Sequence, residues 1–193
     1  LVMEHMDLGS LHSLLHNPSM EVDDETNRMM MLDIVHGCRF LHAASPPVVH
    51  GDLKAQNILV DSNFRAKIAD FGLSQKNSIG AVGTPFFMAP ELLTGESNNT
   101  PASDVFAFAI LLYEIFAREQ PYKGLNHMEV LEGVALKKQP SVRPGIPRSA
   151  DRVIAEIMIE CWKDKPSERP IFTEVSKRLN VLEICDVSAA MSS

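Results

Sequence analysis

His50-Gly51-Asp52-Leu53-Lys54-Ala55-Gln56-Asn57 places a carboxylate, an amine and an amide within one short stretch of the chain. Asp70-Phe71-Gly72 follows Asn57 at a distance of thirteen positions, and Ala89-Pro90-Glu91 comes next. Each motif alone is weak, because Asp52 could be a turn or helix cap and a tripeptide can arise by chance. Their joint order and spacing argue against coincidence, so we interpret them as parts of one site.

In this order and at these spacings, the three motifs resemble the catalytic loop, the metal-binding loop and the activation-segment end of a protein kinase. The resemblance covers nearly the whole chain. The segment from Gly83 to Glu91, the loop residue Lys54 and the pair Cys161-Trp162 are most similar to the tyrosine-kinase-like group, whose members mostly modify Ser and Thr. The implied fold is mainly α with a small β element, a protein-kinase-like large (C-terminal) lobe truncated at the hinge.

The resemblance also implies a role for each polar residue of the site. Asp52 would be the catalytic aspartate that accepts the proton of the substrate hydroxyl, and Lys54 would neutralise charge on the transferring phosphoryl group. Asn57 and Asp70 would bind Mg²⁺, which prefers hard oxygen ligands. Thr84 would hydrogen-bond towards Asp52 and Lys54. ATP and Mg²⁺ are the implied cofactors, and a protein is the implied substrate.

The first residues resemble the last strand and the hinge of a kinase small lobe. Met3 would then occupy the gatekeeper position, and the backbone of Glu4 and Met6 would meet the adenine edge, which needs a donor and an acceptor. Leu59 would form the floor under the adenine, although an ordinary core role fits the same position. Ser10 is assigned to the same nucleotide-binding group.

Two departures from the kinase pattern affect the expected function. Gly51 stands where kinases usually have an arginine that grips a phosphate on the activation loop, so control by phosphorylation of that loop is in doubt. Ser74, Ser78 and Thr84 remain candidate phosphorylation sites, with unmodified loop residues an equal alternative. The chain also contains no glycine-rich loop and no strand lysine for the ATP phosphates, so we expect it to be inactive alone.

Two functions from different classes fit these observations. The first is ATP-dependent phosphoryl transfer to Ser or Thr of protein substrates, by a kinase of which this chain is the large lobe. The second is a kinase-homology (pseudokinase) module that binds nucleotide or protein partners and regulates an attached domain. Such modules often lose a catalytic or metal-binding residue, whereas Asp52, Lys54, Asn57 and Asp70 are all present, which favours the enzyme.

Composition narrows the cellular context of the 193 residues. Hydrophobic residues make up 45% of the chain and the net charge is −7, which argues against nucleic acid or an anionic membrane as the main partner. The longest apolar run, Val105 to Ile115, is shorter than the roughly 20 residues that span a bilayer. Three scattered cysteines, Cys38, Cys161 and Cys185, predict neither a disulfide framework nor a zinc pattern and favour a reducing, cytoplasmic compartment.

Metal binding by histidine is not expected from the sequence. The seven histidines include no H-x-x-x-H pair with a nearby carboxylate, so a metal cage of histidines is not predicted. A metal role for His50 is not expected either, because no partner ligand lies near it in the sequence.

Periodicity predicts one domain, residues 1–184, with a disordered tail at 185–193. We expect short strands at 58–60 and 66–69 joined by a turn, a short helix at 11–16, a long helix at 24–42 and a fully buried helix at 105–116. Three further amphipathic helices are expected to bury the following residues: Met128, Leu131 and Val134; Val153, Ile154, Ile157, Met158 and Cys161; Phe172, Val175, Leu179 and Leu182.

Several polar or aromatic residues are expected to support the site without taking part in the chemistry. His50 and Phe71 should stack on each other. Asp104 should hydrogen-bond the backbone of the catalytic loop. Glu91 and Arg169 match the kinase ion pair that fastens the activation segment to the lower helices, with an exposed helix-end cation as the alternative for Arg169.

Overall fold

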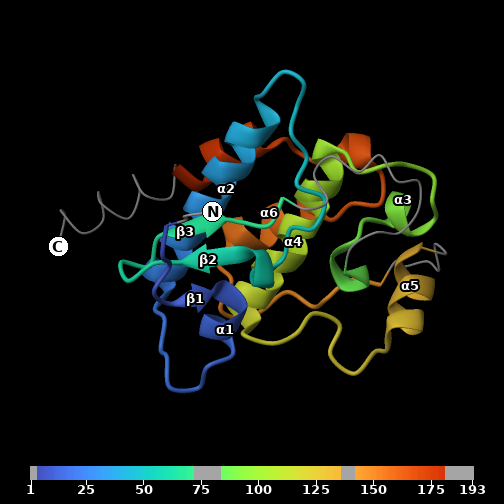
Figure 1. The fold of residues 1–193 in the computed structure, drawn as a ribbon. Coiled ribbons are helices and arrows are strands. Elements are labelled where there is room, and N and C mark those ends of the chain that lie inside the picture. The colour runs from blue at the N-terminus through green and yellow to red at the C-terminus, as the bar shows by residue number, and fades with distance from the viewer. Residues whose placement is uncertain (1–3, 72–83, 136–141, 181–193) are drawn as a thin grey trace.

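The computed structural model describes residues 4–71, 84–135 and 142–180. Helices form most of the structure, and a small sheet lies to one side of them (Figure 1). The helices are α1 (Leu11–Leu15), α2 (Asp24–His42), α3 (Pro90–Leu93), α4 (Pro101–Ala117), α5 (His127–Ala135) and α6 (Arg152–Cys161), and residues 172–180 are also helical. Short 3₁₀ turns occur at η1 (Ala55–Asn57), η2 (Pro85–Phe87) and η3 (Pro166–Glu168). The predicted mainly α fold with a small β element is confirmed.

The sheet consists of three antiparallel strands in the order β1-β2-β3. β2 (Ile58–Val60) and β3 (Ala66–Ile68) form the predicted hairpin, and the Asp61 carboxylate accepts the backbone N–H of Asn63 in its turn at 2.8 Å. β1 (Gly9–Ser10) was not predicted, because two residues show no periodicity. β2 lies in the middle, so the residues directly before it, the catalytic loop, are fixed to the sheet.

Helices α1 and α2 begin at capping side chains. Ser10 accepts the backbone N–H of Ser13 at 3.2 Å, and Asp23 accepts the backbone N–H of Thr26 at 2.7 Å. Each cap satisfies a donor that a helix end leaves without an intrahelical partner. The predicted face of α2 is confirmed by the burial of Met31, Ile34, Val35 and Cys38, while Leu41 is half-buried.

Helix α4 forms the centre of the hydrophobic core. Thr100 and Ser103 form a reciprocal capping box at its start, and Pro101 occupies the first turn, where its missing N–H costs nothing. Every residue from Val105 to Phe116 is buried except the half-buried Tyr113. The prediction of a helix buried on all sides is therefore confirmed, and the groups that α4 presents at its ends are held by a helix that is packed on every side.

The predicted buried face of α5 is confirmed at Val134 and wrong at Met128 and Leu131. Val134 is buried, but Met128 is 64% exposed and Leu131 is half-buried, and Val130 and Gly133 are buried instead. This helix packs its Val130 side against α3 and η2, so the tertiary contact selects a face that is rotated from the one that residues 128, 131 and 134 share.

The C-terminal helices bury the residues that periodicity predicts. Ile154, Ile157, Met158 and Cys161 of α6 are buried, and Val153 is half-buried. Phe172, Val175 and Leu179 are also buried, and Leu182 and the expected tail lie outside the described residues. Trp162 is 8% exposed, as expected for a core residue. Burial raises the pKa of the Cys38 thiol well above its ordinary value, so this cysteine is a core residue and not a nucleophile.

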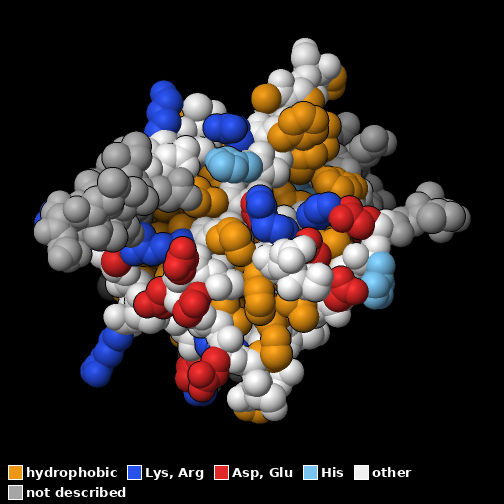
Figure 2. Space-filling view, turned by 90° about the vertical axis from the view of Figure 1, so that its left-hand side faces the viewer, with side chains coloured by type: hydrophobic (Ala, Val, Ile, Leu, Met, Phe, Trp, Pro, Cys, Tyr) orange, Lys and Arg blue, Asp and Glu red, His pale blue; other side chains and the backbone are white. Residues whose placement is uncertain are grey.

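Charged side chains of both signs are interspersed with hydrophobic ones on the face that Figure 2 shows. Ion pairs of the β3 region include Arg65 with Asp33 at 2.5 Å and Lys67 with Glu4 at 2.5 Å. Lys67 and Glu4 are both more than half exposed, so that pair contributes little to stability, whereas Asp33 is 11% exposed and binds Arg65 through two parallel bonds. Within the described residues, no helix is long and apolar enough to cross a membrane.

Candidate active site

The catalytic loop is attached to the N-terminal turn of α4 through one buried carboxylate. Asp104, which is 2% exposed, accepts the backbone N–H of His50 at 2.8 Å and that of Gly51 at 2.9 Å. The His42 ring of α2 contacts the same carboxylate at 2.9 Å. The predicted bond between Asp104 and the loop backbone is confirmed. Gly51 has a φ of +80°, a conformation that glycine adopts without strain.

His50 joins the catalytic loop to the segment after β3. Its Nδ1 accepts the backbone N–H of Asp52 at 3.2 Å, so Nε2 carries the proton and donates to the carbonyl of Ala69 at 2.9 Å. The His50 and Phe71 rings lie 5.3 Å apart between centroids, which confirms their predicted contact. His50 is fully buried, and its two ring nitrogens are both used in positioning the backbone.

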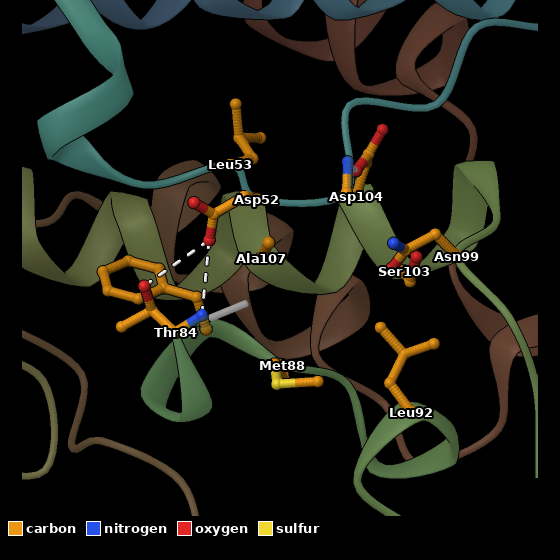
Figure 3. Close-up of a pocket in the computed structure, with 11 residues that line it drawn as sticks. Asp52, Leu53, Thr84, Met88, Leu92, Asn99, Ser103, Asp104 and Ala107 are labelled. Atoms are coloured by element: carbon orange, nitrogen blue, oxygen red, sulfur yellow. Dashed lines mark hydrogen bonds between the residues drawn. The ribbon is translucent and has the colours of Figure 1, made fainter. Parts of the chain in front are cut away.

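Asp52, Lys54 and Thr84 form one cluster of polar contacts. Lys54 Nζ lies 2.6 Å from Asp52 Oδ2 and donates to Thr84 Oγ1 at 2.8 Å. The backbone N–H and the hydroxyl of Thr84 both point to Asp52 Oδ1, at 3.3 and 3.4 Å (Figure 3). Lys54 and Asp52 are 19% and 13% exposed, so the carboxylate is partly shielded but still reachable from solvent.

Asn57 holds Asp52 from the other side. Its Nδ2 donates to the backbone carbonyl of Asp52 at 2.8 Å and to Oδ2 at 3.0 Å. These two bonds fix the amide orientation, so the carbonyl oxygen Oδ1 is the end that faces away from Asp52. The backbone carbonyl of Asn57 accepts the backbone N–H of Ala69 at 2.8 Å. Asp70 follows Ala69 directly, so this bond places the backbone of Asp70 close to Asn57.

An amide oxygen and a carboxylate are hard ligands, and they fit a magnesium ion. Asn57 Oδ1 is oriented for such a role by the two bonds of its Nδ2. Asp70 has a φ of +60°, an uncommon conformation for a residue other than glycine and one that occurs at functional sites. The Asn57 amide oxygen and the Asp70 carboxylate are therefore ligands of the type that suits the Mg²⁺ ion implied by the sequence.

The residues assigned to the nucleotide form a second, separate group. Ser10 and Leu59 are register partners of β1 and β2, and Lys67 is the partner of Leu59 on β3. The Lys67 amine binds the Glu4 carboxylate at 2.5 Å. The Ser10 hydroxyl caps α1, Met6 is buried, and its carbonyl accepts the N–H of Gly9 at 3.0 Å. Met3 lies outside the described residues.

A small pocket lies beneath Asp52, between the catalytic loop, α4 and the residues after Thr84 (Figure 3). Four residues of the pocket wall were not predicted as site residues: Met88, Leu92, Asn99 and Ser103. The signal was indirect: Met88 and Leu92 flank Ala89-Pro90-Glu91 and Ser103 precedes Asp104, which the sequence did single out, whereas Asn99 has no such neighbour.

A buried ion pair fixes the segment that carries this wall. Arg169 binds Glu91 through two parallel bonds of 2.7 and 2.8 Å, and their side chains are 0% and 8% exposed. Arg169 also donates to the carbonyls of Ala102, Lys163 and Asp164. The predicted pair is confirmed, and the alternative of an exposed cation is wrong.

Most of the chain matches the model of a known family. The model of the protein tyrosine and serine/threonine kinase family matches residues 1–179, so the chain belongs to that family. Two curated relatives are the probable serine/threonine-protein kinase drkC of Dictyostelium discoideum, 41% identical over 94% of this chain, and the serine/threonine-protein kinase CTR1 of Arabidopsis thaliana, 37% identical over 94%. The chain spans 25% and 23% of those two proteins. These relatives agree with the tyrosine-kinase-like group that the motifs resemble.

Proposed function

We propose that this chain is the hinge and large lobe of an enzyme that transfers the γ-phosphoryl group of ATP to Ser or Thr of protein substrates. The observation that carries the proposal is the cluster around Asp52. One carboxylate is contacted by the amine of Lys54, the amide of Asn57 and the hydroxyl of Thr84, all within hydrogen-bonding distance. Phosphoryl transfer depends on positioning and charge neutralisation, and this cluster supplies both.

Each residue of the cluster has a definite task in this proposal. Asp52 orients the incoming hydroxyl and accepts its proton. Lys54 neutralises negative charge that develops on the transferred group, and Thr84 aligns Lys54 and lines the acceptor side. Asn57 Oδ1 and Asp70 would hold Mg²⁺, which when bound neutralises the phosphate oxygens.

The nucleotide base would lie against the other group of residues. The backbone of Glu4 and Met6 offers a donor and an acceptor for the adenine edge, Leu59 would form the floor under it, and Ser10 would belong to the same group. We further propose a cytoplasmic location for this domain, because ATP and reduced thiols are found there. Cys38 and Cys161 are both free and buried, in agreement with that proposal.

Two substitutions in the full-length protein test the assignment. Asp70→Ala should abolish Mg-dependent turnover, because it removes a metal ligand. Asp52→Ala should lower kcat by about 10²-fold or more and leave ATP affinity unchanged, because it removes the proton acceptor alone. Asp24→Ala, an exposed carboxylate in the first turn of α2, is the matched control and should retain full activity.

The same experiment separates an enzyme from a kinase-homology module. Turnover is measured as transfer of labelled phosphate to a protein substrate, and ATP binding is measured by calorimetry. Full activity of both Asp52→Ala and Asp70→Ala would refute the proposed site. A protein that binds ATP but transfers no phosphate before any substitution would support the regulatory module.

A further inference from the structure

Two histidines and one buried glutamate meet at the junction of α1 and α4, away from the residues of the candidate active site. His12 Nδ1 lies 2.8 Å and His16 Nε2 lies 3.0 Å from the same Glu114 oxygen, Oε1. The two imidazole rings are 4.4 Å apart between centroids. Among the described residues, this is the one group of three such side chains whose ligand atoms all lie within 4.8 Å of one another.

The sequence pattern did not indicate this cluster. His12 lies in α1 and His16 is its C-cap residue, four positions later, and the nearest carboxylates in the sequence are those of Asp7 and Glu21. The fold supplies the carboxylate of the cluster, because α4 brings Glu114 against α1 from about a hundred positions along the chain. A pattern that is limited to neighbouring residues cannot detect such a site.

The two contacts with the histidines leave one oxygen of the buried Glu114 carboxylate without a hydrogen-bond partner among the described residues. Its side chain is 1% exposed, and its second oxygen, Oε2, is buried without a hydrogen-bond partner in the described structure. A buried carboxylate needs both a positive partner and hydrogen bonds or metal coordination. A cation between the two rings and the carboxylate would meet both needs, since a carboxylate can present either oxygen or both to a metal.

The geometry points to a zinc ion. Zinc binds histidine nitrogen and carboxylate oxygen at about 2.0–2.2 Å, so neighbouring ligand atoms of a tetrahedral site lie about 3.3–3.5 Å apart. The observed separations of 2.8 and 3.0 Å from Glu114 Oε1 are shorter than that value by about 0.3–0.7 Å, so the ligands would move slightly apart to admit the ion. His12 and His16 are 28% and 27% exposed, so a water molecule could reach the fourth position. We propose that His12, His16 and Glu114 form a Zn²⁺ site.

Such a site would join α1 to the centre of the core. α1 is only five residues long, and its N-cap Ser10 lies in the strand beside Leu59. Gln56, directly before Asn57, places its amide nitrogen 3.2 Å from His12 Nδ1, and a metal ion bound to Nδ1 would replace this contact, because the nitrogen has one lone pair. The bound ion would therefore stabilise the junction between the nucleotide-binding group and α4, without taking part in phosphoryl transfer.

Metal titration of the full-length protein tests the site. The protein carries Cys185→Ser to remove a thiol outside the described residues and is freed of metal with a chelator. ZnCl₂ is then added in a calorimeter, and CoCl₂ is added in parallel because cobalt in such a site gives visible absorption bands. We expect one Zn²⁺ more per chain than in His12→Gln/His16→Gln. Loss of one ligand should weaken this binding by about 100-fold or more, since even outer-shell changes cost 10–100-fold.

Stability gives a second readout. Saturating Zn²⁺ should raise the Tm of the domain by about 5 °C or more, and the double variant should show no such rise. His36→Gln, an exposed histidine of α2 outside the cluster, is the matched control and should bind like the unmodified protein. Equal zinc stoichiometry in the unmodified protein and the double variant, or no cobalt bands in the unmodified protein, would overturn the proposal. The protein with all three ligands carries only Cys185→Ser, outside the cluster, so its cobalt spectrum does not depend on the folding of a ligand variant.

Discussion

Thr84 shows how a single hydroxyl can order the candidate active site. It accepts a hydrogen bond from Lys54 and lies within reach of Asp52, so it sits between the cation and the carboxylate of the proposed reaction. Lys54 also pairs with Asp52 directly. The arrangement keeps a long, flexible amine in one place, which lowers the entropy cost of aligning it with a phosphate.

Removal of that hydroxyl should impair catalysis more than folding. In the full-length protein we expect Thr84→Val to lower kcat/KM about 10–100-fold, because a hydrogen bond to a charged group contributes about 1.5–3 kcal/mol. Thr84→Ser retains the hydroxyl and should stay within about threefold of the unmodified enzyme. Steady-state kinetics on one protein substrate compares the two. Equal losses in both variants would show that the methyl group, and not the hydroxyl, is what matters.

The contacts of single residues were predictable where the sequence has the motif spacing of a known family. Asp104, the Glu91–Arg169 pair and the His50–Phe71 contact were all expected from the kinase pattern, and the structure contains each of them. Met88 and Leu92 of the pocket wall carried no such signal, because an apolar side chain that lines a pocket has the same sequence signature as one that fills a core. The roles of Asp52, Lys54, Asn57 and Asp70 stay predictions.

Between elements, the buried Glu91–Arg169 pair fixes α3 to the loop before residues 172–180. Two bonds join the charges, and three backbone carbonyls accept the remaining donors of the guanidinium. The arginine also lies over the ring of Phe106 at 5.1 Å. A charge buried this completely is tolerated only while its partner is present.

Breaking this pair should therefore destabilise the domain strongly. We expect Glu91→Ala to lower the free energy of unfolding by about 3–5 kcal/mol, since it leaves the guanidinium buried without a counter-charge. Glu119→Ala breaks an exposed pair with Lys123 and should cost less than about 1 kcal/mol. Urea unfolding of both variants gives the comparison. A cost for Glu91→Ala no larger than that for Glu119→Ala would contradict the structural role of the buried pair.

The N-terminus of α2 should show a pH dependence. Hydrogen bonds from Thr26 lower the pKa of Asp23 below its ordinary value of 3.8, so the charged form favours the folded state. The contribution is present above that ordinary value and is lost as the pH falls through the lowered pKa. In Asp23→Asn, which keeps a capping oxygen, we expect the Tm difference from the unmodified protein to shrink as the pH is lowered from 6 to 3. A constant difference over this range would be inconsistent with the cap.

The buried face of a helix was predictable where the spacing of its apolar residues is compatible with one face only. The buried residues of α2 and α4 agree with the sequence pattern. α2 is long and has one apolar face, and α4 is apolar almost all round, so each pattern is compatible with one mode of burial. α5 differs, because it is short and its apolar residues, Met128, Val130, Leu131 and Val134, are compatible with two neighbouring faces. Contact with α3 and η2 decides between them, and that information lies elsewhere in the chain.

At the scale of the whole molecule, the structure consists of a helical body built around α4 and a sheet that borders it (Figure 1). The catalytic loop lies between the two, attached to α4 by Asp104 and continuous with β2. Both candidate groups, around Asp52 and around Leu59, therefore belong to one connected unit. The chain includes no glycine-rich loop with a following strand lysine, so the phosphates would need further contacts from another segment.

The isolated chain should consequently be inactive. We expect the purified 193 residues to transfer no detectable phosphate from Mg-ATP, whereas a longer protein that combines this chain with a glycine-rich loop and a strand lysine should be active. Radiolabelled phosphate transfer to one protein substrate is measured for both, and circular dichroism checks that the isolated chain is helical. Phosphate transfer by a chain that is free of contaminating kinase would show that the prediction is wrong.

The single carboxylate of Asp104 has a consequence for how such a protein can diverge. It connects the catalytic loop to the buried helix α4, so a substitution at an exposed position that contacts neither α4 nor η2 leaves the bonds to His50 and Gly51 in place. Related chains could thus differ at such outer positions and keep the same conformation of the loop that carries Asp52.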